Sequence, residues 1–142
     1  MKTRWKLLLA LAATGLWLWF IYAHSLATGE ESRAESRAVL EFLRRIFPFA
    51  DVVMVRKSAH VFEFFVLGFL LYLDWRLLGR STVLVPLCAG LLFAAADEIL
   101  QTFVPARSGE VLDVLIDFCG VAAGVGAGVL LRKWKEARRR GG

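Results

Sequence analysis

The sequence predicts an all-α membrane protein with four transmembrane helices in an antiparallel bundle. The 142 residues are 58% hydrophobic with a mean hydropathy of +0.57, which is too apolar for a soluble domain of this length. Segments 5–24, 58–78, 82–101 and 111–131 are each long enough to cross a hydrocarbon core of about 30 Å. The connections 74–81 and 102–110 are so short that neighbouring spans must run antiparallel. No linker or repeat divides the chain, so residues 1–142 form a single domain.

The basic residues predict the orientation. One side of the membrane would carry 11 Lys and Arg with 2 acids, and the other would carry 7 Lys and Arg with 11 acids. By the positive-inside rule both termini are cytoplasmic, and the protein is a multi-pass protein of the plasma membrane. We interpret the basic tail at Arg138, Arg139 and Arg140 as a topology signal that meets anionic headgroups. The expected partner is therefore the lipid bilayer, and nucleic acid is not expected.

The first apolar segment has two interpretations. Its basic start, its apolar run and the triplet Ser25-Leu26-Ala27 are typical of a cleavable signal peptide. Its length, however, suffices for a span, and Trp17, Trp19 and Tyr22 stand where an interfacial aromatic belt belongs. We expect the segment to be retained as the first span.

Residues 28–50 form the only long connection. Within it apolar residues recur at helical spacing, and charged residues take the other positions. These apolar positions are Val39, Leu40, Phe42, Leu43, Ile46 and Phe47. The pattern predicts an amphipathic helix that lies in the outer interface and ends at Pro48. It favours a solvated cap over the bundle, with a helix that docks a partner as the alternative.

Ionisable residues inside spans are costly, so they indicate a functional site. In the second span Lys57, His60 and Glu63 follow one another at steps of three and share one broad face. In the third span Asp97 and Gln101 lie on one stripe with two small residues, Gly90 and Ala94. The acidic excess of this region includes Glu98.

The fourth span repeats this arrangement. Asp113 and Asp117 share a face with three glycines, and these glycines form two overlapping GxxxG steps that permit close helix packing. The glycines are Gly120, Gly124 and Gly128. We expect the glycine and alanine faces to pack in the cytoplasmic half, which brings the acids together in the outer half.

The sequence therefore predicts an outward-facing polar chamber. Lys57 and His60 are expected at its rim, and Arg107, on the short connection, is expected to fold over the acids. The candidate ligand-binding residues are Lys57, His60, Glu63, Asp97, Glu98, Gln101, Arg107, Asp113 and Asp117.

With these residues assembled, the chain resembles the VanZ-like family of small bacterial membrane proteins, named for an accessory protein of teicoplanin resistance. The runs that carry the resemblance are 56–64 (RKSAHVFEF), 97–109 (DEILQTFVPARSG) and 113–117 (DVLID), the last followed by Gly120. The chain departs from the family pattern at Phe64, Leu100 and Ala106, where Tyr, His and Gly are usual, and its serine-rich patch is reduced to Ser25. The resemblance implies a protein that faces the cell envelope, but it transfers no detailed mechanism and no drug resistance.

The residues favour a binding protein over an enzyme. The first hypothesis is an envelope protein whose chamber binds a polar or lipid-linked ligand or a glycopeptide, with no cofactor and no metal. The alternative is a membrane-embedded hydrolase or transferase acting on a lipid-linked substrate, in which four side chains hold a divalent ion. These are His60, Glu63, Asp97 and Asp113. No HExxH, GxSxG or phosphate-binding loop supports catalysis.

Two further interpretations remain. A proton-coupled transporter would use carboxylates in its spans, but the apolar cytoplasmic halves offer no continuous path. Alternatively, the charged residues form a salt-bridge cluster that only fixes helix packing. The residues specify neither the ligand nor the oligomeric state.

Overall fold

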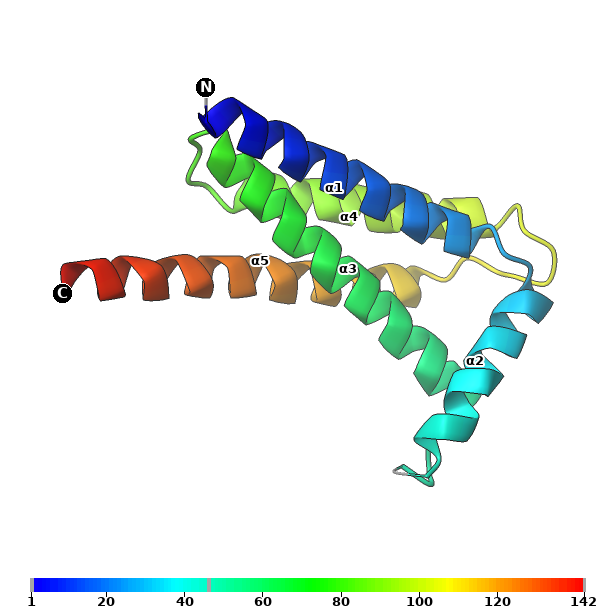
Figure 1. Cartoon of the computed structure of the whole chain (residues 1–142). Coiled ribbons are helices and arrows are strands. Elements are labelled where there is room, and N and C mark those ends of the chain that lie inside the picture. The colour runs from blue at the N-terminus through cyan, green and yellow to red at the C-terminus, as the bar shows by residue number, and fades with distance from the viewer. Residues whose placement is uncertain (1, 46, 142) are drawn as a thin grey trace.

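A computed structural model describes residues 2–45 and 47–141, and this part of the chain holds five helices and no strand (Figure 1). They are α1 (Lys2–Ser25), α2 (Gly29–Leu43), α3 (Val52–Leu77), α4 (Leu84–Gln101) and α5 (Val111–Arg140). The helices α1, α4 and α5 are long and apolar enough to cross a membrane. The prediction of an all-helical membrane protein is thus confirmed at this level, whereas a fourth span in α3, the antiparallel bundle and the cytoplasmic termini stay predictions.

Two helices extend six or more residues beyond their predicted bounds. α3 begins at Val52, six residues early, because the Asp51 side chain caps it by accepting a hydrogen bond from the Met54 N–H at 2.7 Å. α5 continues from the predicted end at residue 131 to Arg140, since its lysine, arginine and alanine residues are good helix formers.

The helices α3 and α5 cross each other closely (Figure 1). A Cβ atom added at Gly120 would meet the backbone of Val61, and one added at Gly124 would overlap the Phe65 carbonyl oxygen. Gly128 lies against the Tyr72 ring. The predicted glycine packing is therefore present, but the partner of this face is α3.

The matching stripes had indicated that α4 would pack against these glycines. Gly90 of α4 instead lies against the side chain of Val121. Val121 also approaches Gly68 of α3, where an added Cβ would overlap its backbone. Small residues on three helices thus permit the close contacts.

The buried core joins side chains from four helices. It consists of Ile21, Phe64, Leu67, Tyr72, Ala94, Val121 and Val125. By contrast, large apolar residues such as Leu9, Leu92 and Leu112 face outward and are more than half exposed. Exposed apolar surface of this kind is expected where lipid is the solvent.

A polar pair links α1 to α3 away from the predicted chamber. Thr14 Oγ1 donates a hydrogen bond of 2.7 Å to Asp74 Oδ2, and both residues are buried. The sequence had placed Asp74 in a connection, whereas the structure places it inside α3.

We expect Thr14→Val to destabilise the protein by about 1–3 kcal/mol, because it leaves the buried Asp74 carboxylate without this donor. Denaturant unfolding in detergent micelles measures the change. Thr14→Ser, which keeps the hydroxyl, is the control and should lose much less. Equal stability of the valine and serine variants would contradict the expectation.

The helix α2 confirms the predicted amphipathic helix, but it ends at Leu43 and not at Pro48, and it turns a different face to the protein. It begins with a capping box in which Thr28 and Glu31 satisfy each other's backbone N–H groups. Hydrogen bonds from Thr28 lower the pKa of the exposed Glu31 carboxyl, so this cap is weakened as pH falls through that pKa.

The face of α2 that is buried carries small and polar residues. These are Gly29, Ser32 and Ser36, together with Leu40. Val39 and Phe42 are at least half exposed, and Ile46 lies outside the described residues. α2 packs mainly against the first half of α3, so it does not cap the other helices with its apolar face (Figure 1).

Candidate functional site

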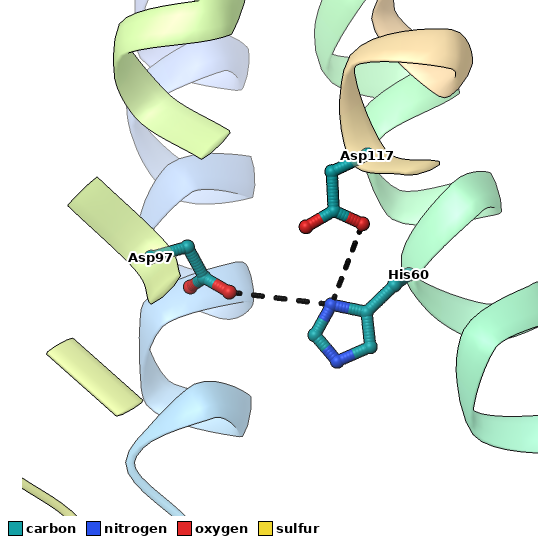
Figure 2. A group of neighbouring side chains, drawn as sticks. All are labelled: His60, Asp97 and Asp117. Carbon is teal, nitrogen blue, oxygen red and sulfur yellow. Dashed lines mark ion pairs between the residues drawn. The ribbon is translucent and has the colours of Figure 1, made fainter. Parts of the chain in front are cut away.

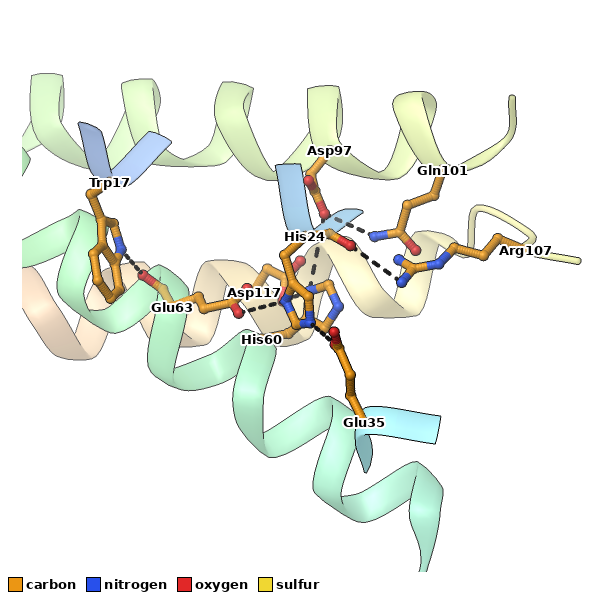
Figure 3. A network of polar contacts seen from close by, with 9 residues as sticks. All are labelled: Trp17, His24, Glu35, His60, Glu63, Asp97, Gln101, Arg107 and Asp117. Carbon is orange, nitrogen blue, oxygen red and sulfur yellow. Dashed lines mark hydrogen bonds and ion pairs between the residues drawn. The ribbon is translucent and has the colours of Figure 1, made fainter. Parts of the chain in front are cut away.

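Polar side chains gather at one end of the molecule, which we call the polar end. Here α1 ends at Ser25, α4 ends at Gln101 and α5 begins at Val111 (Figure 1). Side chains from all five helices and from the 102–110 connection meet in this region (Figure 3). The predicted residues separate there into a centre and four peripheral contacts.

The centre is formed by His60 of α3, Asp97 of α4 and Asp117 of α5, which we call the central cluster (Figure 2). His60 Nδ1 lies 4.0 Å from Asp97 Oδ2 and 3.8 Å from Asp117 Oδ1. The His60 side chain is 12% exposed, and the two carboxylates are 0% and 1% exposed. The expectation that His60 lies at the rim is therefore wrong.

Gln101 orients one member of the central cluster. Its Nε2 donates a hydrogen bond of 2.8 Å to Asp97 Oδ2, one turn back on α4. The stripe that predicted this pair followed from the helical period, and both side chains are buried as expected. Ser25 lies next to the Asp97 carboxylate, and its buried hydroxyl has no hydrogen-bond partner among the described residues.

Glu63 pairs with α1. Its Oε1 lies 2.9 Å from His24 Nδ1, and the other ring nitrogen of His24 lies 3.1 Å from Glu35 Oε2 on α2 (Figure 3). Trp17 Nε1 donates a hydrogen bond of 2.9 Å to the Glu63 carbonyl oxygen. His24 thus connects three helices.

Sequence reasoning missed His24, Trp17 and Glu35 as site residues. A histidine and a tryptophan near the end of an apolar span are typical of interfacial anchors. The one signal available was their spacing, because Trp17 and His24 stand seven residues apart and so share a helix face.

Three other predicted residues form contacts at the edge of the site. Lys57 Nζ lies 2.5 Å from Asp113 Oδ1, and both side chains are partly exposed. Glu98 Oε2 accepts a hydrogen bond of 2.8 Å from the Glu110 backbone N–H, which ties the connection to α4. Asp113 and Glu98 therefore have polar partners outside the central cluster.

Arg107 does not fold over the acids. Within the described part of the chain it forms no ion pair, and its Nη2 donates a hydrogen bond of 3.5 Å to the His24 carbonyl oxygen. Its buried Nε has no hydrogen-bond partner among the described residues. Burial lowers the pKa of the Arg107 guanidinium, which stays charged because its ordinary pKa is so high.

The connection that carries Arg107 docks on the start of α2. The Gly29 N–H donates a hydrogen bond of 3.2 Å to the Pro105 carbonyl oxygen, and an added Cβ at Gly29 would overlap the backbone of Ala106. Ala106 itself has φ of 60°, in the left-handed region that favours glycine. This is a position where the chain departs from the family pattern described above.

We expect Ala106→Gly to stabilise the protein by about 1 kcal/mol, because glycine removes the steric cost of this left-handed backbone. Thermal unfolding in detergent measures the shift. Ala106→Val should be clearly less stable than the parent, and a glycine variant that unfolds earlier than the parent would contradict the interpretation.

An apolar groove of about 950 Å³ opens beside the polar end. It lies between α2 and the first half of α3, and its apolar lining includes Val39, Leu43, Phe47, Met54, Ala59 and Phe62. His24 and Glu35 also line it. Because His24 contacts Glu63 as well, the groove and the polar residues share one wall.

Comparison with known proteins identifies the family. The family model described as VanZ/LLP1 matches residues 10–132, which is most of the chain. The chain belongs to the VanZ/LLP1 family. The resemblance seen in the sequence is thereby confirmed.

One similar relative is the uncharacterized membrane protein YwnJ of Bacillus subtilis (strain 168). The two are 34% identical over 98 residues, which is 69% of this chain and 64% of that protein. The chain thus matches less than two thirds of the relative's length. No solved structure matches the chain.

The motifs that carry the VanZ/LLP1 resemblance also contain the residues of the central cluster. Each of the three runs that carried the resemblance, 56–64, 97–109 and 113–117, supplies one member of the cluster. The fold therefore brings one residue from each of the three motifs together in one buried group of side chains.

Proposed function

We propose that this VanZ/LLP1-family chain is a bacterial plasma-membrane protein that binds the head of a lipid-linked envelope molecule at its polar end. In this topology α1, α3, α4 and α5 are the four spans, both termini are cytoplasmic and the polar end faces outward. The basic residues that follow the apolar part of α5 support this orientation. They are Arg132, Lys133, Lys135, Arg138, Arg139 and Arg140.

The observation that carries the proposal is the shared wall between the apolar groove and the polar end. A lipid-linked molecule has a long apolar chain and a compact polar head, so it needs these two environments side by side. His24 and Glu35 line the groove, and His24 also contacts Glu63 at 2.9 Å. A chain that lies in the groove would place its head beside these residues.

The donors near this wall favour a head group with phosphate. Arg107 contacts the backbone of His24, and its Nε is buried without a hydrogen-bond partner among the described residues. A planar guanidinium is well suited to phosphate oxygens. A head that bound here would supply the missing acceptor.

The test uses undecaprenyl phosphate as the probe, with the protein in nanodiscs and the bound probe measured by native mass spectrometry. Ala59→Trp should weaken binding by roughly tenfold or more, because it fills the groove. Val53→Trp is the matched control, since Val53 is exposed on the same helix and does not line the groove. Equal binding by both variants, or no binding by the parent, would overturn the proposal.

A competition arm separates the classes of ligand. Teicoplanin and a phospholipid of similar charge are added to the bound probe. Displacement by teicoplanin alone at stoichiometric concentration would assign the site to glycopeptides, and would connect this chain to glycopeptide resistance. Displacement by the phospholipid would show that the groove does not distinguish isoprenoid chains from acyl chains.

One observation supports a second candidate, a hydrolase or transferase acting on the lipid-linked molecule. His60 lies within 4.0 Å of two buried carboxylates, an arrangement suited to general acid and base catalysis. Incubating the protein with undecaprenyl pyrophosphate and assaying free phosphate tests it. Release by the parent that is lost in His60→Gln would establish turnover, and its absence would leave binding alone.

A further inference from the structure

The central cluster presents three metal-ligating side chains from three different helices. Its ligand atoms all lie within 4.8 Å of one another. Figure 2 shows His60 Nδ1 directed between the Asp97 and Asp117 carboxylates. This grouping differs from the set expected from the sequence, since Glu63 pairs with His24 and Asp113 pairs with Lys57.

The cluster contains buried acceptors that the protein leaves unsatisfied. Neither oxygen of Asp117 has a hydrogen-bond partner among the described residues, and neither has Asp97 Oδ1. The Ser25 hydroxyl beside Asp97 is 1% exposed and is also without a partner in the described part of the chain. Buried carboxylates without partners are strongly unfavourable, so these atoms indicate a missing ligand.

The separations suit a cation better than direct hydrogen bonds. At 4.0 Å and 3.8 Å the His60 nitrogen is too far from the two carboxylates to donate to them. In a tetrahedral site with bonds of about 2.0–2.2 Å, ligand atoms stand about 3.4 Å apart. Ligand atoms that now lie up to 4.8 Å apart would have to approach one another by at most about 1.4 Å to reach this spacing.

The donor set indicates which ion fits. One imidazole with two carboxylates suits a divalent first-row transition metal, and two negative charges balance its charge. Three protein ligands with one remaining position is the pattern of an open zinc site. Gln101, which donates to Asp97 at 2.8 Å, would hold that carboxylate in place from outside the coordination shell.

We propose that His60, Asp97 and Asp117 bind a zinc ion in this protein. The ion replaces the missing partners of both carboxylates and joins α3, α4 and α5 at the polar end. Three protein ligands would leave its fourth position open to water. The proposal does not depend on the lipid-linked ligand, because it concerns the ion alone.

The test measures zinc bound to the purified protein. Protein in detergent is washed with chelator, exposed to Zn²⁺, desalted and analysed for metal by mass spectrometry. We expect stoichiometric zinc in the parent and none in Asp117→Asn. Asp113→Asn is the matched control, because Asp113 pairs with Lys57, and it should keep the zinc of the parent. Zinc retained by Asp117→Asn, or lost equally from both variants, would overturn the proposal.

Two further measurements test the proposal even if Asp117→Asn fails to fold. Gln101→Leu keeps all three ligands and should bind zinc about 10–100-fold more weakly, because Asp97 loses its orienting donor. In the unsubstituted protein, Zn²⁺ should raise the unfolding temperature and Mg²⁺ at the same concentration should not. No shift with Zn²⁺ would contradict the proposal without any substitution.

Discussion

Replacing Gly124 with isoleucine is expected to destabilise the protein by about 3 kcal/mol or more. Even the first added carbon would overlap the Phe65 carbonyl oxygen, which belongs to the backbone of α3 and cannot rotate away. Inserting atoms into a tight contact typically costs about 1–3 kcal/mol, and a clash with backbone falls at the upper end of that range or above it. A loss of this size is a large part of the total stability of a protein of this length.

Gly126 provides a matched control on the same helix. A Cβ atom added there would meet nothing within 4 Å. Gly126→Ile therefore makes the same chemical change without the clash and should alter stability by less than about 0.5 kcal/mol. Unfolding of both variants in detergent, followed by helical circular dichroism, measures the difference. Equal stability of the two variants would show that α3 and α5 do not pack through this glycine.

The Gly124 substitution should also disturb the central cluster. Asp117 lies one turn before Gly120, and Gly120 is the next close contact between α5 and α3. Forcing the helices apart at Gly124 moves the Asp117 carboxylate away from His60. Folded material of Gly124→Ile is thus expected to bind less zinc than Gly126→Ile, although neither residue touches the central cluster.

The helical period predicted which faces are buried. Asp97, Gln101 and Asp117 are inward-facing as their stripes indicated, because the period fixes the direction of each side chain on its own helix. The period does not specify the partner helix. The glycine face of α5 therefore packs on α3, a result that depends on how the helices are rotated and offset relative to one another.

The parts that sequence reasoning misplaced follow from the same limit. The pairing of His24 with Glu63 joins residues 39 positions apart, and their separation depends on the relative height of α1 and α3. Arg107 lies on a connection that is not helical, so no helical period could predict where its side chain points. The apolar residues of α2 were expected to face the protein, but in a membrane apolar surface is equally stable against lipid.

Replacing His24 with phenylalanine is expected to destabilise the protein by about 1–3 kcal/mol. The His24 side chain is 29% exposed and is the partner of Glu63, whose side chain is only 6% exposed, so removing His24 leaves a buried carboxylate without this partner. The aromatic ring of phenylalanine keeps most of the volume, so little of the loss comes from a cavity. Chemical unfolding in detergent micelles measures the change.

A second substitution tests whether the loss of stability comes from the Glu63 carboxylate. Glu63→Gln in the His24→Phe background should recover part of the loss, because a neutral amide is less costly to bury than a carboxylate. Leu16→Ala is the control for substitutions on α1, since Leu16 is largely exposed and should change stability little. A double variant no more stable than His24→Phe would show that the ion pair is not the source of the effect.

The same experiment decides whether the first segment is retained. Cleavage after Ala27 would remove all of α1, and with it His24 and the Trp17 donor to Glu63. A chain processed in that way would be insensitive to His24→Phe, whereas a chain that keeps α1 would lose stability. Since α1 also supplies Ser25 beside Asp97, its retention is required for the polar end to form as described. A response to His24→Phe would therefore identify α1 as a structural part of the site and exclude its role as a cleaved signal peptide.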